Sequence, residues 1–294
     1  MKNHISLFIF AIALLSGPVS ANDLSMTAVK DTLASIPGEH NYIYVRTPLG
    51  EDEEKNYDEI TFYDGLGREL DFAQSYGADR AGAIMAHHHL IEYDSLGRKE
   101  KQWLSTNTSF SYMSPEDLKG GVLWDYHDAG KRSYLQTNYE SSPLNRITEQ
   151  YGVGDAWGDH PARMEYLTNI PADSLRCSFY FIDDNDSLIR RGDYRSGELQ
   201  VTKATDEDGK PTYTFVDKQG RTLLTRLGRG NQQADTYFVF DRFGRIRYVL
   251  PPMINDEISA GNLDLYAYQY LYDSFGRCIS KKLPGCAAIG YVYD

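Results

Sequence analysis

The histidine triplet at 87–89 consists of residues that can act as metal ligands. In an extended strand His87 and His89 would lie on one face, and imidazole is a common zinc ligand. Two imidazoles make only half of a tetrahedral site, and the histidines at 40, 127 and 160 occur without HExxH or cysteine-rich spacing. The favoured interpretation is a polar strand surface, and we predict no metal and no other cofactor.

The segment GDAWGDHP (154–161) places Asp155, Asp159 and His160 around Trp157, which superficially resembles a carboxylate and histidine pair. A catalytic pair must converge on a pocket, whereas this composition is typical of a turn-rich loop, which we expect a packed tryptophan to anchor. GxSxG, P-loop and dinucleotide fingerprints are absent from the sequence. We therefore predict that the chain is not an enzyme. A pocket that joined His160 to two carboxylates would favour the alternative, a hydrolase.

Acidic residues outnumber basic ones, 42 Asp and Glu against 30 Lys and Arg, for a net charge of −12 at pH 7. This charge repels phosphate backbones and anionic lipid, so nucleic acid is a poor candidate partner. The acidic stretch GEDEEKNYDE (50–59) clusters carboxylates that calcium prefers, but it lacks alternating DxDxDG spacing. A solvated hairpin tip is the favoured interpretation there.

The first 21 residues have the order of a secretory signal peptide: Lys2, the apolar run ISLFIFAIALL and the small-residue end VSA. We expect cleavage between Ala21 and Asn22 and export to the periplasm, the cell surface or the medium. Later apolar runs are all shorter than the ~20 residues that a membrane helix needs, so no membrane span is predicted.

Three cysteines leave two interpretations open. Cys278 and Cys286 can pair across the short segment CISKKLPGC, which would leave Cys177 free. Alternatively, all three are unpaired and pack as small apolar residues.

A hexamer recurs along the sequence, and it predicts the strands and turns that would position the candidate residues described above. YDxxGR occurs at 63–68, 93–98 and 272–277, and weaker copies occur at 126–131 (YHDAGK), 205–210 (TDEDGK), 216–221 (VDKQGR) and 240–245 (FDRFGR). A catalytic motif is used once per site, whereas a sequence copied along a chain indicates a structural repeat.

The chemistry of the hexamer is that of a β-turn. Its Asp side chain can accept a hydrogen bond from the backbone two residues on, its Gly tolerates a positive φ, and its Arg opens the return strand. These features predict a type I turn closed by a G1 bulge, and therefore one β-hairpin per copy. The predicted turn residues are Asp64, Gly67, Arg68, Asp94, Gly97, Arg98, Gly130, Gly209, Gly220, Asp241, Gly244, Arg245, Asp273, Gly276 and Arg277.

The flanking segments predict strands. TYTFV (212–216) and DTYFVFD (235–241) are rich in β-branched and aromatic residues. In LDLYAYQYLYD (263–273) strict alternation predicts one strand, with Tyr266, Tyr268, Tyr270 and Tyr272 on one face. We favour a cross-strand aromatic ladder for these tyrosines over a platform that stacks sugars.

Helix has little support in the sequence. MTAVKDTLASI (26–36) predicts a short amphipathic helix, and SPEDLKG (114–120) predicts a helix start; strand and turn are expected elsewhere. The predicted fold is all-β, with meandering hairpins that form an open, curved sheet or a partial β-shell.

The hexamers resemble the YD repeats of bacterial rearrangement-hotspot (RHS) and teneurin-like proteins. NYIYVRTPL, YESSPLNRITEQYGVGDAW, TDEDGK and LPGCAAIGYVYD look like the N-terminal uncharacterised domain and following repeats of a secreted branch of that family. The resemblance covers about residues 41–294. It implies a scaffold without catalytic residues, in which repeats wind hairpins into a hollow shell around a C-terminal cargo.

This resemblance gives an expected organisation: a signal peptide (1–21), a linker or short helix (22–40), an N-terminal RHS-associated β domain (41–170) and a YD-repeat sheet (171–294). Tyr293 and Asp294 would begin another hexamer, so the sheet is expected to end within a repeat, with an unpaired edge open to strand addition. The implied partners are the remainder of an RHS shell or its cargo, in cis or in trans. Surface glycans are the alternative partner.

Overall fold

The computed structural model describes residues 33, 36, 38, 40–48, 56–78, 84–127, 130–228, 233–254 and 256–294. The predicted signal peptide lies outside the described residues, as do most of the predicted helix at 26–36 and most of the acidic stretch. The chain divides into two compact units, Met1–His160 and Pro161–Asp294.

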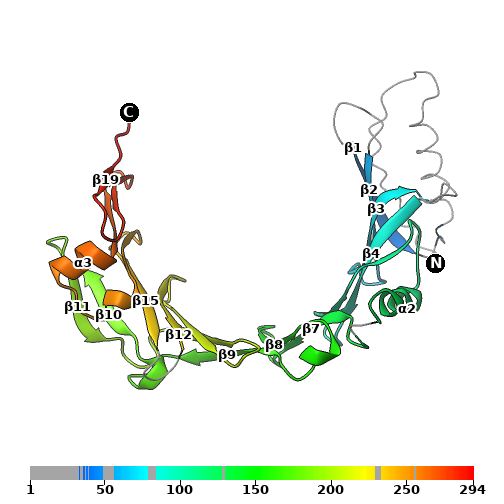
Figure 1. Cartoon of the computed structure of the whole chain (residues 1–294), viewed down its shortest axis with the longest axis horizontal. Coiled ribbons are helices and arrows are strands. Elements are labelled where there is room, and N and C mark those ends of the chain that lie inside the picture. Colours follow the sequence, from blue (N-terminus) through cyan, green and yellow to red (C-terminus); the bar gives the residue numbers. More distant parts are fainter. Residues whose placement is uncertain are drawn as a thin grey trace. The chain divides into compact units, whose positions relative to one another are not determined.

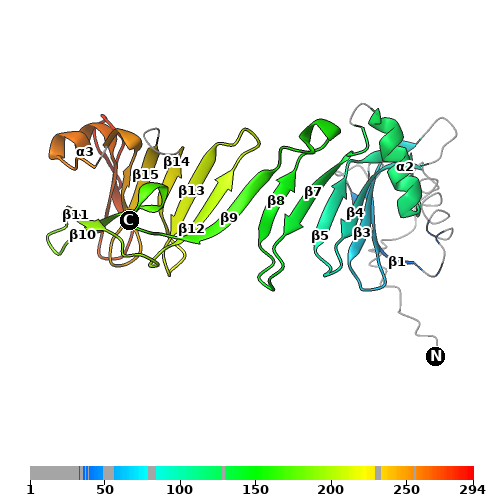
Figure 2. The ribbon, with the colours of Figure 1, turned by 90° about the horizontal axis from the view of Figure 1, so that it is seen from below.

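The first unit is an antiparallel sheet that is covered in part by helix α2 (Pro115–Asp125). Its strands are β1 (Asn41–Pro48), β2 (Asn56–Tyr63), β3 (Glu69–Ala78), β4 (Ile84–Tyr93), β5 (Lys99–Trp103), β6 (Thr106–Ser109), β7 (Tyr134–Tyr139) and β8 (Ile147–Tyr151). β1 to β4 pair in chain order, and β4 then pairs with β6 near its start and with β5 near its end. β5, β7 and β8 complete the sheet (Figure 2).

Helix α2 (Pro115–Asp125) confirms the helix start predicted at Ser114. The Ser114 side chain caps the helix by accepting from the backbone N–H of Asp117, and Pro115 occupies the first turn, where its missing N–H costs nothing. Leu118 and Val122 are buried, because one face of the helix packs beside β4 and β6.

The second unit is a meander of antiparallel strands with a hairpin on one face. The sheet runs β9 (Ala162–Thr168), β12 (Gln200–Thr205), β13 (Pro211–Val216), β14 (Thr222–Leu227), β15 (Ala234–Phe240), β16 (Ile246–Leu250), β17 (Tyr268–Tyr272), β18 (Cys278–Lys282) and β19 (Ile289–Gly290). β10 (Ser178–Ile182) and β11 (Leu188–Asp193) form a separate two-stranded sheet (Figure 1). The predicted strands TYTFV and DTYFVFD are β13 and β15, and the predicted all-β fold of antiparallel hairpins is confirmed.

The core of the second unit lies between the sheet and the β10–β11 hairpin. Alternate residues of the central strands point to this side, including Phe215, Leu224 and Val239, which are at most 2% exposed. Cys177 and Tyr180 pack against them from the hairpin side. Short 3-10 helices η3 (Asp173–Leu175) and η5 (Pro252–Ile254) flank this core.

Two predictions about local structure are wrong. The first is the strand at 263–273: its first part is helix α3 (Ala260–Tyr266), and only Tyr268–Tyr272 is strand. Ser259 caps the helix by accepting from the backbone N–H of Asn262. The helix and its C-cap direct Leu263, Tyr266 and Ala267 toward the core at i, i+3 and i+4 spacing, so Tyr266 does not share a strand face with the other tyrosines.

The second wrong prediction is a hairpin at YHDAGK. Gly130 has the expected positive φ of 72°, but it connects α2 to β7 instead of joining two paired strands. Glycine is needed here for a close approach as well, because a Cβ at position 130 would clash with a carboxylate oxygen of Asp155.

Candidate functional site

Five hexamer turns share one hydrogen-bonding scheme. In each, the Asp backbone N–H donates to the Arg carbonyl, and the Gly N–H donates to the Asp carbonyl. One Asp side-chain oxygen accepts from the backbone N–H groups two and four residues on, and the other accepts from the Arg Nε at 2.7 Å. The Asp, Gly and Arg residues of these turns are Asp64, Gly67 and Arg68; Asp94, Gly97 and Arg98; Asp217, Gly220 and Arg221; Asp241, Gly244 and Arg245; and Asp273, Gly276 and Arg277.

The five glycines have φ between 76° and 84°. Strand pairing shifts by one residue beside most of these turns, for example between Phe62 and Tyr63, which is the irregularity that a bulge produces. Gly209, in the weaker copy at 205–210, has φ 78° and the same two backbone bonds.

The turn carboxylates are held in their ionised form. Burial alone would raise their pKa values, but donation by the backbone N–H groups and the arginine outweighs it, so the pKa values of Asp64, Asp94, Asp217, Asp241 and Asp273 all lie below the usual range. Each hexamer therefore contains its own neutralised ion pair.

The arginine of each turn also contacts an aromatic ring outside its own hairpin, and in four of the five cases this ring begins the next turn along the sheet. Arg68 lies over the Tyr93 ring, with its guanidinium carbon 4.4 Å from the ring centroid. The corresponding distances are 4.7 Å for Arg98 over Tyr139, 5.1 Å for Arg221 over Phe240, 4.8 Å for Arg245 over Tyr272 and 4.8 Å for Arg277 over Tyr293. We call these five pairs the arginine–aromatic ladder. All are cation–π contacts; four join consecutive hairpins, and the fifth joins Arg277 to the segment that follows β19.

The tyrosines return a hydrogen bond to the preceding turn. The Tyr93 hydroxyl donates to the Glu69 carbonyl at 2.6 Å, and Glu69 directly follows the arginine that covers the Tyr93 ring. Tyr139, Tyr272 and Tyr293 repeat this bond at 3.0, 2.9 and 2.8 Å. Phe240 has no hydroxyl and cannot make it. Each tyrosine step of the ladder thus acts through both a ring and a hydroxyl.

Two further turns adopt the scheme with other residues. In YESSPLNR (139–146) Glu140 replaces the aspartate and bonds Arg146 twice, at 2.8 and 2.7 Å, while Asn145 takes the left-handed position with φ 54°. Donation by Arg146 and Ser142 lowers the pKa of Glu140 to about 2.

The second variant is the β10–β11 turn, which sequence reasoning missed. Asp186 stands there in place of glycine, with φ 63°, and both backbone bonds of the scheme are present. Its side chain forms a bidentate ion pair with Arg247, whose side chain is only 7% exposed. Aspartate tolerates the left-handed region better than most residues, so a rule that required glycine could not find this turn.

The histidine triplet lies on strand β4, with His87 and His89 on one face and His88 on the other. His88 is buried, and its two ring nitrogens lie 2.7 Å from an Asp71 carboxylate oxygen and 3.0 Å from the Ser109 carbonyl. This contact ties β4 to β3 and β6. Within the described ranges, no group of three or more His, Cys, Asp or Glu is arranged to hold a metal ion.

The loop at 154–161 is anchored by Asp155, and the expectation of a packed tryptophan anchor is wrong, since Trp157 is 47% exposed. The Asp155 carboxylate accepts from the backbone N–H groups of Lys131 and Arg132, so it closes the connection from α2 to β7. Asp159 and His160 follow in the same loop, and the His160 backbone N–H donates to the Trp157 carbonyl.

All three cysteines are unpaired, as the second interpretation states, but only Cys177 is packed as a buried apolar residue; Cys278 is partly buried. Cys177 is buried, and burial raises the pKa of its thiol to about 12. Cys286 is exposed.

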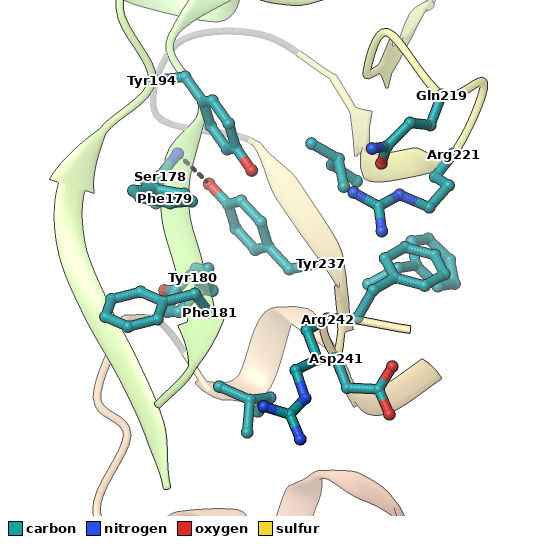
Figure 3. A pocket seen from close by; sticks show the side chains of 14 residues that line it. Ser178, Phe179, Tyr180, Phe181, Tyr194, Gln219, Arg221, Tyr237, Asp241 and Arg242 are labelled. Carbon is teal, nitrogen blue, oxygen red and sulfur yellow. Dashed lines mark hydrogen bonds between the residues drawn. The ribbon is translucent and has the colours of Figure 1, made fainter. Parts of the chain in front are cut away.

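A cavity of about 340 Å³ lies between strand β10 and the sheet of the second unit (Figure 3). The hairpin that forms one wall is fastened to the sheet at several points. Arg226, only 2% exposed, donates to Asp235 and to the carbonyls of Ser174 and Arg176 at the base of the hairpin. Arg247 holds Asp186 at the tip.

Comparisons with known proteins agree with this architecture. The model of a family described as "Domain of unknown function (DUF6443)" matches residues 41–168. A search of curated protein sequences found no match.

Solved structures similar to this chain include the one titled "Crystal Structure of TcdB2-TccC3-Cdc42", with 14% sequence identity and a TM-score of 0.50, over 90% of this chain and 12% of that chain. The structure titled "Crystal Structure of TcdB2-TccC3" has 13% identity and a TM-score of 0.48, over 82% of this chain and 11% of that chain. The first likeness is informative about fold alone: part of the matched chain has a fold similar to the antiparallel sheet of this chain. This chain spans about an eighth of the length of the chain that it matches.

Proposed function

We propose that this chain is a non-enzymatic wall segment of an exported RHS-type β-shell, and that it acts by enclosing or presenting a cargo. Its partners are the remainder of such a shell or the cargo itself. The observation on which this rests is the arginine–aromatic ladder, for example Arg245 over Tyr272 at 4.8 Å. The ladder fastens each hairpin to the next, as a continuous wall requires.

The chemistry of the turns supports a scaffold. Their carboxylates and guanidinium groups neutralise one another within each turn, so they hold backbone and aromatic rings in place and leave no free acid–base pair there. In the described part of the chain, no helix is long and apolar enough to cross a membrane.

The alternative, a sugar-binding platform of tyrosines at 266–272, loses its main argument. Tyr266 belongs to α3, and Tyr272 is covered by Arg245 while its hydroxyl donates to the Ile246 carbonyl. Tyr268 and Tyr270 alone do not make a row, so we do not retain this alternative.

The wall function is tested by assembly. The exported chain is produced together with the polypeptides encoded beside its gene, each tagged, and the purified material is examined by electron microscopy and limited proteolysis. We expect co-purification of a repeat-containing partner, a hollow particle, and protection of an enclosed polypeptide until the particle is opened. A chain that stays alone with every neighbouring product, and protects none of them, would refute the proposal.

Export has its own test. The mature chain recovered from outside the cytoplasm should begin at Asn22 when its intact mass is measured. Retention in the cytoplasm with Met1 and Lys2 present would show that this part of the proposal is wrong.

A further inference from the structure

Strand β10 has one edge that is not used by its hairpin partner. In an antiparallel pair, the N–H and C=O groups of alternate residues point to the partner, and those between point away. The Asp183 N–H donates to the Ser187 carbonyl across the turn, so Asp183, Phe181 and Phe179 face β11. Ser178, Tyr180 and Ile182 therefore direct their backbone groups to the opposite edge.

A hydrogen bond at Ser178 independently shows that its backbone N–H points away from β11. The Ser178 N–H donates to the Tyr237 hydroxyl at 3.3 Å, and Tyr237 belongs to β15, on the far side of this edge from β11 (Figure 3). Within the described residues, two contacts satisfy the outward edge of β10, and both are at Ser178: this bond, and the Cys177 thiol, which donates to the Ser178 carbonyl at 3.7 Å. Tyr180 and Ile182 have no such backbone bond.

The cavity runs along this edge. Its lining includes every residue of β10, from Ser178 to Ile182, which happens when a cavity follows the side of a strand instead of one face. The opposite wall is mixed: Leu223, Phe238 and Phe240 are its apolar residues, and Gln219 and Tyr237 are among its polar ones. A volume of about 340 Å³ is within the usual range of ligand pockets.

The charges at the cavity favour an acidic occupant. Asp241 and Arg221 line it, but each is held in an ion pair within its own turn, to Arg245 and Asp217. Arg242 is different: it is exposed, it lies over the Phe243 ring at 4.9 Å, and no carboxylate of the described residues pairs with it. The cavity thus has a free cationic end in a chain whose net charge is −12.

We propose that this cavity binds an extended polypeptide segment, which adds a third strand to the β10–β11 hairpin by pairing with Tyr180 and Ile182. Main-chain bonds supply the affinity in this mode, and alternate side chains supply the specificity. One set of side chains faces Leu223 and Phe240, and an acidic residue lies near Arg242. The site is independent of the wall function, because it lies within one unit of this chain.

The test uses fluorescein-labelled, end-blocked hexapeptides that alternate valine or phenylalanine with threonine and end in glutamate. Binding to the full chain is measured by fluorescence polarisation. We expect saturable binding, and a loss of at least tenfold when alternate backbone amides of the peptide are methylated. Replacing the terminal glutamate by glutamine should weaken binding several-fold for the natural chain and have little effect for the Arg242→Gln variant.

Two matched variants isolate the strand edge. Ile182→Pro removes one outward N–H, and proline is tolerated on an edge strand because the hairpin does not use that group. Ile182→Val keeps the N–H and should bind within twofold of the natural chain, whereas Ile182→Pro should bind at least tenfold more weakly. Amide hydrogen exchange on the natural chain is a second readout that needs no variant, since the peptide should slow exchange at Tyr180 and Ile182.

Several results would overturn the proposal. One is the absence of saturable binding up to millimolar peptide. Equal affinity for the methylated peptide, or unchanged exchange at both amides, would exclude strand addition. The chain could instead bind uronic-acid oligosaccharides on a glycan array and bind no peptide. If Arg242→Gln abolished this oligosaccharide binding, the cavity would be a sugar site. All of these measurements use the isolated chain, so failure of shell assembly does not affect them.

Discussion

Arg245 provides the sharpest test of the arginine–aromatic ladder. Its guanidinium forms an ion pair with Asp241 at 2.7 Å, donates to the Asp273 carbonyl at 3.4 Å and lies 4.8 Å from the Tyr272 ring centroid. The side chain is 25% exposed. The change Arg245→Ala removes these three contacts, together with a cation–π contact to Phe243 of its own turn at 4.8 Å, while leaving the turn glycine in place.

The expected cost follows from these contacts. A partly exposed ion pair contributes about 0.5–1 kcal/mol, a cation–π contact about 0.5–1 kcal/mol, and a long backbone hydrogen bond about 0.5 kcal/mol. We therefore expect Arg245→Ala to lower the free energy of unfolding by about 2 kcal/mol. Arg245→Lys keeps the charge but loses the planar stacking, and should cost about 1 kcal/mol.

Urea unfolding followed by circular dichroism measures these changes, and Arg242→Ala is the matched control. Arg242 lies in the same turn, but it contacts Phe243 of that turn and not the next hairpin, so its loss should cost under about 0.5 kcal/mol. A double-mutant cycle of Arg245→Ala with Tyr272→Leu should give a coupling of about 0.5–1 kcal/mol. Equal effects of the two alanine variants, or zero coupling, would refute the ladder as a source of stability.

Three other predictions concern the turns and the thiols. Gly244→Ala should lower the free energy of unfolding in urea by about 1 kcal/mol, because alanine is strained in the left-handed backbone conformation. Gly97→Ala should lower it further, because the new Cβ would lie 3.0 Å from Arg68 Nη1 and displace this group from Tyr93. Equal effects of the two variants would contradict this. The pKa of Glu140 is lowered to about 2 in the folded state, so its contribution to stability is complete above pH about 4.5 and is lost as the pH falls toward about 2. Glu140→Gln should make unfolding in urea less sensitive to acid over this interval, and an unchanged pH profile would argue against it. The pKa values of the turn aspartates are also lowered, so they contribute in the same direction. Cys286 is exposed and should react with a thiol reagent at pH 8 in the folded chain, whereas the buried Cys177 should react only after unfolding. Rapid modification of Cys177 in the native protein would show that it is not buried as described.

The turns could be predicted from the sequence because their chemistry is local. An aspartate that bonds the next few backbone N–H groups and a glycine that takes φ near 80° interact within one hexamer, so the letters are sufficient. The strands followed from the same local logic, since β-branched and aromatic residues flank most turns.

The ladder could not be predicted in the same way, because a stacked pair such as Arg98 and Tyr139 is 41 positions apart and depends on which turns become neighbours. The recurrence of both residue types was the available signal. The burial of His88 also required the structure, since three identical residues in a row give no indication of which face is inside.

Helix α3 was missed for a different reason. Alternation of leucine and tyrosine over 263–273 satisfied the strand pattern, while Leu263, Tyr266 and Ala267 also satisfy helical spacing, and tertiary packing decided between them. Ser259, three residues before Asn262, was the capping signal that distinguishes the two.

The weaker copy at 205–210 separates two requirements that the full hexamer combines. In a meander successive turns alternate between the two ends of the strands, so the turn at Asp206 lies at the opposite end from the turns at Asp217, Asp241 and Asp273. It keeps the aspartate and the glycine, which the turn itself needs.

It does not keep the aromatic residue or the arginine. Thr205 and Lys210 stand in their places, and Lys210 pairs with Asp208 within its own turn at 3.2 Å. An arginine of one turn and an aromatic residue of the next are found where two hexamer turns lie side by side at the same end of the sheet, as Arg221 has Phe240 and Arg245 has Tyr272. Aspartate and glycine are therefore requirements of the chain reversal, whereas the aromatic residue and arginine are requirements of the contact between hairpins.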